Sequence, residues 1–155
     1  MRNFIKLIAT FFGVGYLPIV QGSFGSLASL LIFVFIIKGA VALHFTTFLI
    51  VTILGFFVAG PAEIIFKKKD SGHIVIDEVA GMLLSLFFIP FKPVYIFWAF
   101  FLFRLFDTIK PAPTEKFEKL SGSVGIMMDD LIAGIYTNIC LQIVYLILAG
   151  NRLSA

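Results

Sequence analysis

Long stretches without a charged residue constrain this chain more than any other feature of its sequence. The stretches at residues 7–37, 39–62 and 131–151 are 31, 24 and 21 residues long, and residues 79–103 are interrupted only by Lys92. About 20 apolar residues form a helix that crosses the hydrocarbon core of a bilayer. Of the 155 residues 60% are hydrophobic and 14% charged, whereas about a quarter of the residues of a soluble domain are charged. The sequence therefore predicts an all-α integral membrane protein.

Glycine and proline divide the first of these stretches. Residues 39–62 and 131–151 are each predicted to form one spanning helix. The first half of residues 7–37 holds four glycines and a proline, which favour breaks in regular structure. We therefore expect an interfacial N-terminal segment, then a glycine-rich loop, then a short helix over about residues 26–37.

Two prolines bend the fourth apolar stretch. Pro90 and Pro93 limit helix continuation, which predicts a hairpin with arms at residues 74–89 and 94–109. Each arm is short for a bilayer, so the hairpin either spans or re-enters. The complete prediction is a single membrane-embedded domain over residues 1–155. It has four to five transmembrane or re-entrant helices and an interfacial N-terminal segment.

The distribution of Lys and Arg predicts which side of the membrane each loop occupies. With the N-terminus inside, eight of these residues lie on the cytoplasmic side and three outside, in accordance with the positive-inside rule. The net charge of +3 suits an anionic lipid surface, and no basic soluble domain is present to bind nucleic acid. The inner set is Arg2, Lys6, Lys67, Lys68, Lys69, Lys110, Lys116 and Lys119, and the outer set is Lys38, Lys92 and Arg152.

Acidic residues gather at the predicted cytoplasmic interface. The pairs Asp77-Glu78 and Asp129-Asp130 each follow three apolar residues and are predicted to begin apolar helices, where the helix dipole alone would stabilise them. Adjacent carboxylates withdrawn from water repel each other unless a cation lies between them, and hard divalent cations such as Mg²⁺ prefer oxygen ligands. The sequence therefore predicts a divalent-cation site. The six acidic residues at this interface are Asp70, Asp77, Glu78, Asp107, Asp129 and Asp130.

Basic residues and glycines near these acids suit a phosphate group. Arg104, Asp107 and Lys110 follow at intervals of three residues, so Arg104 is either the ion-pair partner of Asp107 or a bidentate ligand of phosphate. The glycine-rich stretches at residues 13–18 and 22–26 precede the predicted helix over 26–37. Converging backbone N–H groups and a helix N-terminus bind anions there, although the stretch is also explained as a simple break between two helices.

Four blocks in this order resemble the phosphatidylglycerophosphatase A family. They are residues 13–18 with 22–26, residues 74–81 (IVIDEVAG), residues 103–113 (FRLFDTIKPAP) and residues 125–134 (GIMMDDLIAG). Members of this family are small membrane enzymes that need Mg²⁺ and remove the terminal phosphate of phosphatidylglycerophosphate to release phosphatidylglycerol. The resemblance implies a multi-pass protein of a bacterial inner membrane, with an anionic phospholipid substrate and an active site that faces the cytoplasm. Gln21 and Ser23 depart from the family, which more often has proline and threonine there.

The resemblance also implies roles for individual residues. The expected Mg²⁺ ligands are a subset of Asp77, Glu78, Asp107, Asp129 and Asp130. The expected catalytic residues are Asp77, Asp129, Asp130 and Arg104, with one Asp of the pair at 129 and 130 acting as nucleophile or as base. The expected substrate-binding residues are Arg104, Lys110, Ser23, Gly25 and Ser26. Two alternatives stay open: a non-enzymatic cation-binding transporter or channel subunit, and a lipid headgroup transferase.

Overall fold

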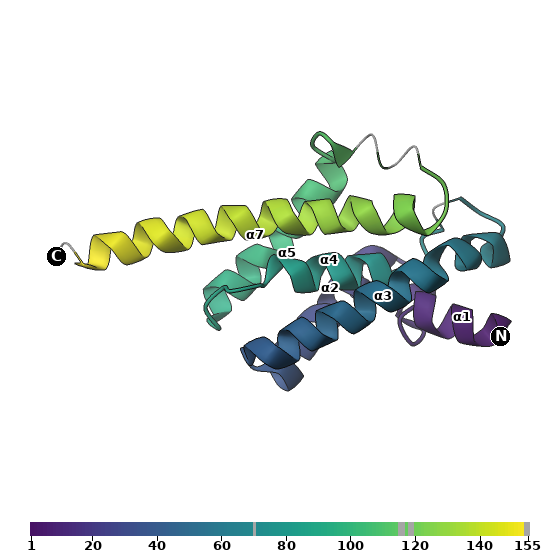
Figure 1. The fold of residues 1–155 in the computed structure, drawn as a ribbon, viewed down its shortest axis with the longest axis horizontal. Helices are drawn as coiled ribbons and strands as arrows, with labels where there is room; N and C mark the ends of the chain where they lie inside the picture. Colours follow the sequence, from purple (N-terminus) through teal and green to yellow (C-terminus); the bar gives the residue numbers. More distant parts are fainter. Residues whose placement is uncertain (70, 115–116, 118–119, 154–155) are drawn as a thin grey trace.

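The computed structural model of this protein describes residues 1–69, 71–114, 117 and 120–153, with side chains described as far as Ala149. Within these ranges the chain forms helices and turns without a β-strand, which confirms the predicted all-α class (Figure 1). Asp70, Lys116 and Lys119 lie outside the described residues, as does the side chain of Arg152. The elements are α1 (Arg2–Ala9), the 3₁₀-helix η1 (Val14–Tyr16), α2 (Gln21–Ile32), the π-helix η2 (Phe33–Ile37), α3 (Val41–Phe66), α4 (Ile76–Ser85), α5 (Pro93–Ile109) and α7 (Ser123–Leu153).

A short buried helix, α4, lies at the centre of the fold. It packs against α2, α3, α5 and α7 (Figure 1). Its 10 residues give a length of about 15 Å, too short to cross a bilayer. Eight of these residues are buried. The arm predicted over residues 74–89 is therefore helical over only part of its length.

Polar side chains on the surrounding helices satisfy the backbone carbonyl groups of α4 and of the turn after it. Ser29 Oγ of α2 donates to Val79 O (3.2 Å), and His44 Nε2 of α3 donates to Leu83 O (2.9 Å). From α7, Asn138 Nδ2 donates to Ser85 O (3.1 Å) and to Phe87 O (2.7 Å). Buried carbonyl groups without hydrogen-bond partners are energetically costly, so these polar residues in apolar helices have a structural role. His44 is accordingly packed inside the protein and hydrogen-bonded.

Within the described residues, two helices are long and apolar enough to cross a membrane: α3, with 26 residues, and the part of α7 from Ser123 to Ala149. Both predicted spanning helices are confirmed as helices, and both are longer than expected. Helix α7 begins eight residues before Leu131, where Ser123 Oγ accepts a hydrogen bond from Gly60 N of α3 (2.7 Å). Asp129 and Asp130 therefore lie in the second turn of α7. The prediction that this pair begins a helix is wrong, and the dipole of a first turn does not explain it.

Helix α2 begins at Gln21, five residues earlier than predicted. Residues 22–26, expected in a glycine-rich loop before the helix, form its first turns instead. The 17 residues Gln21–Ile37, α2 with η2, make a further apolar helical segment, shorter than α3 and α7. Glycine weakens a helix interior, so tertiary contacts must decide the start of α2, and those contacts are at the candidate site described below.

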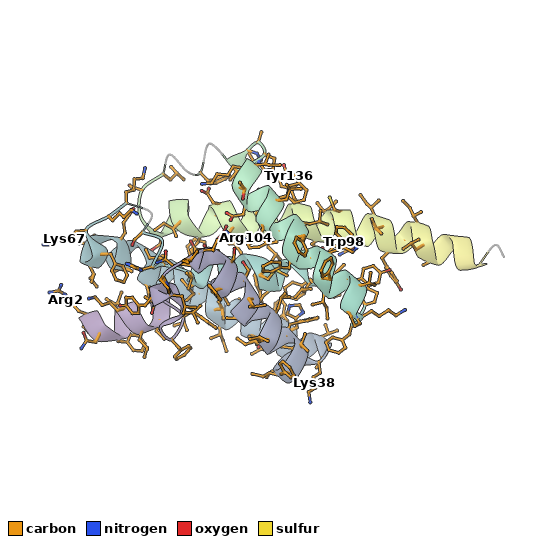
Figure 2. All side chains as sticks on the ribbon, turned by 180° about the vertical axis from the view of Figure 1, so that it is seen from behind. Arg2, Lys38, Lys67, Trp98, Arg104 and Tyr136 are labelled. Atoms are coloured by element: carbon orange, nitrogen blue, oxygen red, sulfur yellow. The ribbon has the colours of Figure 1, made fainter. Side chains whose placement is uncertain are left out.

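The bend at Pro90 and Pro93 is present as predicted. Pro93 is the first residue of α5, where its missing N–H leaves no helical hydrogen bond unmade. Of the basic residues predicted on opposite sides of the membrane, Arg2 and Lys67 lie at one end of the molecule and Lys38 lies far from both (Figure 2). The number of membrane spans stays a prediction.

Replacement of Asn138 tests the central role of α4. Asn138→Leu leaves the carbonyl groups of Ser85 and Phe87 without their donor, and we expect the free energy of unfolding to fall by about 1–3 kcal/mol. The measurement is reversible unfolding in mixed micelles. Thr47→Val is the control, because it removes an exposed bond within α3 and should change stability by less than about 0.5 kcal/mol. Equal stability of the Asn138→Leu variant and the wild type would contradict this interpretation.

Candidate functional site

Three carboxylates from two helices meet beside α4. Asp77 and Glu78 lie in its first turn, and Asp130 comes from the second turn of α7. One oxygen from each lies within 4.8 Å of the other two, and Asp77 and Asp130 are only 6% and 4% exposed. Three acids this close and this buried repel one another unless positive charge or protons lie between them. A hard divalent cation accepts such an all-oxygen set, so these residues could hold one.

Glycines on α4 and α7 bring these acids together. A Cβ atom on Gly81 would collide with the backbone oxygen of Asp130, and one on Gly134 would collide with the backbone oxygen of Gly81. Gly81 follows Asp77 by one turn and Gly134 follows Asp130 by one turn. The two backbones can therefore approach closely just beside the acids, as small residues permit in apolar helix pairs. The repeated spacing of Asp and Gly was a sequence signal that our prediction did not use.

Helix α2 closes another side of the cluster through Gly22 and Gly25. A Cβ atom on Gly22 would collide with Glu78 Oε1 and lie 3.0 Å from Arg104 Nη1. A Cβ atom on Gly25 would lie 3.0 Å from the Val75 side chain. These contacts account for glycines inside a helix, because any larger residue would separate α2 from the acids.

Arg104 of α5 connects the acidic residues. Its Nη1 atom lies 3.0 Å from Asp107 Oδ2 and 4.0 Å from Glu78 Oε1. The ion pair between Arg104 and Asp107, one of the two predicted roles of Arg104, is therefore present in a half-buried setting beside Glu78. A guanidinium group here can also bind a planar pair of phosphate oxygens.

Asp129 and Asp130 face different neighbours. Lys110 Nζ donates to Asp129 Oδ2 (3.0 Å), which brings the residue after α5 against α7. Asp129 also lines a polar pocket of about 220 Å³ that includes Glu63 and Lys69. Consecutive residues on a helix point about 100° apart, so this pair divides between the three-acid cluster and the pocket.

Burial changes the titration of the cluster. Removal from water raises the pKa of Glu78 above its ordinary value, whereas contact with Asp77 and the charge of Arg104 lower it, and the charge of Asp107 raises it further. A cation in contact with the carboxylates favours their ionised form.

The loop before α4 is fixed by contacts that the sequence did not predict. Val75 N donates to Ala9 O (3.0 Å), and His73 Nδ1 donates to Gly15 O (2.8 Å). Gln21 Nε2 lies 3.3 Å from the same His73 nitrogen, so the residue that departs from the family pattern joins this loop to α2. The N-terminal segment thus positions the start of α4, and with it Asp77.

The expected substrate-binding residues of α2 lie in different settings. Gly25 is buried against α4 as described above. Ser26 is also buried, and its hydroxyl donates to Gly22 O within the helix (3.0 Å). Ser23 is half-buried in the first turn. Ser26 therefore has a structural partner of its own, whereas Arg104 and Lys110 lie directly beside the acids.

Comparison with known proteins gives a consistent family. The model of a family described as phosphatidylglycerophosphatase A matches residues 7–145. The chain is 38% identical over 142 residues to phosphatidylglycerophosphatase A of Haemophilus influenzae, covering 88% of this chain and 85% of that protein. It is 32% identical over 137 residues to phosphatidylglycerophosphatase A of Escherichia coli, covering 87% and 80%. A Bacteroides thetaiotaomicron protein named "Putative phosphatidylinositol-3-phosphatase" is 34% identical over 145 residues, covering 88% and 91%. No solved structure matches.

A double-mutant cycle tests the contact between Gly22 and Glu78. Gly22→Ala places a methyl group against the Glu78 carboxylate, and overpacking of this kind lowers the free energy of unfolding by about 1–3 kcal/mol. In a Glu78→Ala background the same substitution should be at least about 0.5 kcal/mol less destabilising, because the obstructing carboxylate is gone. Unfolding of all four proteins in mixed micelles gives the coupling. Additive effects of the two substitutions would contradict the predicted contact.

Proposed function

The chain belongs to the phosphatidylglycerophosphatase A family and is a phosphatase, and we propose that it hydrolyses the terminal phosphomonoester of phosphatidylglycerophosphate with the aid of Mg²⁺. The products are phosphatidylglycerol and inorganic phosphate. The observation that carries the proposal is the buried cluster of Asp77, Glu78 and Asp130 beside Arg104. This arrangement combines ligands for a divalent cation with a guanidinium group for the phosphate.

The three clustered acids are the proposed metal ligands. Their oxygens lie close enough to share one ion, and they are all hard donors, which fits Mg²⁺. A Mg²⁺ ion bound there supplies charge that polarises the phosphoryl oxygens. The ligands come from α4 and α7, whose close approach at Gly81 and Gly134 holds them in place without a mobile loop.

Arg104 is the proposed phosphate ligand. It pairs with Asp107 in the described structure, and a phosphomonoester with its two negative charges would compete for the same guanidinium group. In phosphoryl transfer, neutralisation of the negative charge on the transferring group stabilises the transition state and makes a large contribution to the rate. Asp107 then keeps Arg104 aligned before substrate arrives.

Asp129 is the proposed base. It lies outside the three-acid cluster, borders the polar pocket, and forms an ion pair with Lys110 at 3.0 Å. In this role its carboxylate accepts a proton from the attacking water, the new P–O bond forms from that water, and the bond to the lipid oxygen breaks. A covalent aspartyl-phosphate on one Asp of the pair Asp129-Asp130 is the alternative that the sequence left open.

The apolar surface of α3 and α7 supports a site at a membrane interface. Both helices are long enough to cross a bilayer, and the substrate of such an enzyme is itself a membrane lipid. The excess of Lys and Arg at the end that carries Arg2 and Lys67 supports a cytoplasmic position of the site in a bacterial inner membrane.

The first measurement is phosphate release by the purified protein in detergent, with Mg²⁺ or with EDTA. We expect release from phosphatidylglycerophosphate that needs Mg²⁺. Phosphatidylinositol 3-phosphate is the second substrate to assay, because the name of the Bacteroides relative points to it. Faster release from that lipid would overturn the proposed substrate. Absence of release by folded protein would favour cation transport, and exchange of headgroups without free phosphate would indicate a transferase.

Three variants separate the proposed roles. Asp130→Asn should weaken Mn²⁺ binding, measured by electron paramagnetic resonance, whereas Asp129→Asn should bind Mn²⁺ normally and lose turnover. Arg104→Gln should lower kcat/KM at least about 100-fold. Lys92→Gln is the control. Lys92 lies at the N-terminal end of α5, about three turns from Arg104, so this variant should retain activity. Normal turnover in the Asp129→Asn variant, or normal Mn²⁺ affinity in the Asp130→Asn variant, would refute the corresponding role.

A further inference from the structure

An apolar groove of about 530 Å³ lies between α5 and the segment formed by α2 and η2. We name it the α2–α5 groove. Leu27 and Leu30 line it from α2, Val34 from η2, and Ile96, Phe97 and Phe100 from α5. Leu27 and Phe97 are 42% and 55% exposed, so the groove is open along its side.

One end of the α2–α5 groove points toward the candidate site. The two helices come together at Gly22 and Arg104, where a Cβ atom on the glycine would lie 3.0 Å from the guanidinium group. Phe100 precedes Arg104 by one helical turn, and Leu27 follows Gly22 by between one and two turns. The apolar walls therefore begin one to two turns away from the proposed phosphate ligand.

Phe91 lines the other end of the α2–α5 groove. Its ring packs against Phe33 with centroids 5.6 Å apart, and its Cβ would lie 3.3 Å from a Cβ on Gly39. Between the two ends, Leu27 to Val34 spans about 10 Å along the helical axis. The groove is thus an elongated apolar cleft with one end near the charged site and Phe91 at the other.

We propose that the α2–α5 groove holds one acyl chain of the lipid substrate while the phosphate group binds at Arg104. This inference rests on the proposed function. A lipid phosphomonoester has the same order of parts as the cleft: an anionic group joined to an apolar chain. In the groove the acyl chain is buried against apolar side chains. Its position there determines how far along α2 and α5 the attached phosphate group can lie.

A second apolar groove on α5 shows why the first is favoured. It measures about 310 Å³ and lies between α5 and α7, lined by residues that include Trp98, Leu102 and Val144. One turn beyond Leu102, Phe106 packs against Tyr136 of α7 with ring centroids 5.7 Å apart. These rings lie beyond the second groove on the side of the site, whereas nothing comparable is described between Phe100 of the α2–α5 groove and Arg104, one turn further along α5.

Photochemical labelling tests the occupant directly. The probe is phosphatidylglycerophosphate with a diazirine in the middle of one acyl chain, bound to the Asp129→Asn protein so that the phosphate is retained. The control probe has the same chain and a choline headgroup. We expect labelling of the α2–α5 groove to be at least about fivefold stronger with the phosphomonoester probe, and labelling between α5 and α7 to be equal for both. Equal labelling of the α2–α5 groove by both probes, or a headgroup preference only between α5 and α7, would overturn the proposal.

Wild-type phosphate release, measured in parallel, separates the two claims. Release without headgroup-dependent labelling refutes the acyl-chain site alone. Labelling without release refutes the proposed hydrolysis and supports the groove as a lipid phosphate site. Absence of both refutes both.

A matched pair of bulky substitutions gives a kinetic test. Val34→Trp fills the α2–α5 groove, and Val144→Trp fills the second groove with the same change of side chain. We expect Val34→Trp to raise KM for a long-chain substrate about tenfold more than for its dihexanoyl analogue, because the short chains need less of the groove. Val144→Trp should not discriminate between the two chain lengths. Equal effects of Val34→Trp on both substrates would contradict an acyl-chain role, and retained thermal stability shows that each variant is folded.

Discussion

The hydrogen bonding of one buried helix determines the arrangement of the rest of this protein. Helix α4 has only 10 residues, eight of them buried, and is surrounded on its sides by other helices, so its terminal backbone groups need partners from within the protein. Asn138 and His44 satisfy carbonyl groups towards its C-terminal end, and Asp77 and Glu78 occupy its first turn at the positive end of the helix dipole. The same short helix thus fixes the core and presents the acids of the candidate site.

Close backbone contacts then convert this helix into a site. Gly81 and Gly134 allow α4 and α7 to approach beside the acids, while Gly22 brings α2 against Glu78 and Arg104. Each contact uses the absence of a side chain, so the carboxylates are held by rigid elements. Because burial without compensation would favour protonated carboxyl groups, we propose a divalent cation as the partner that keeps three such acids charged together. The apolar α2–α5 groove starts where this charged region ends, which matches the two parts of a lipid phosphate.

The sequence was sufficient to predict the helical class, two of the long helices, the proline bend and the acids that meet beside Arg104. Those features follow from local patterns: charge-free runs, prolines and paired carboxylates. It was insufficient for the starts of α2 and α7. Glycines at residues 22 and 25 indicate a loop by local propensity, yet contacts with Glu78 and Val75 place them in a helix. Likewise, α7 begins at Ser123, whose hydroxyl accepts a hydrogen bond from Gly60 N, a residue distant in the sequence. Asp129 and Asp130 then lie inside the helix and contact different neighbours.

The position of a bound divalent cation tests the central claim most directly. Mn²⁺ can replace Mg²⁺ in oxygen-ligand sites and gives an anomalous X-ray signal, so crystals of the protein grown with Mn²⁺ would locate the ion. We expect an anomalous peak between the carboxylates of Asp77, Glu78 and Asp130. A peak in the pocket beside Glu63 and Asp129 instead, or no peak near α4 at saturating Mn²⁺, would contradict it.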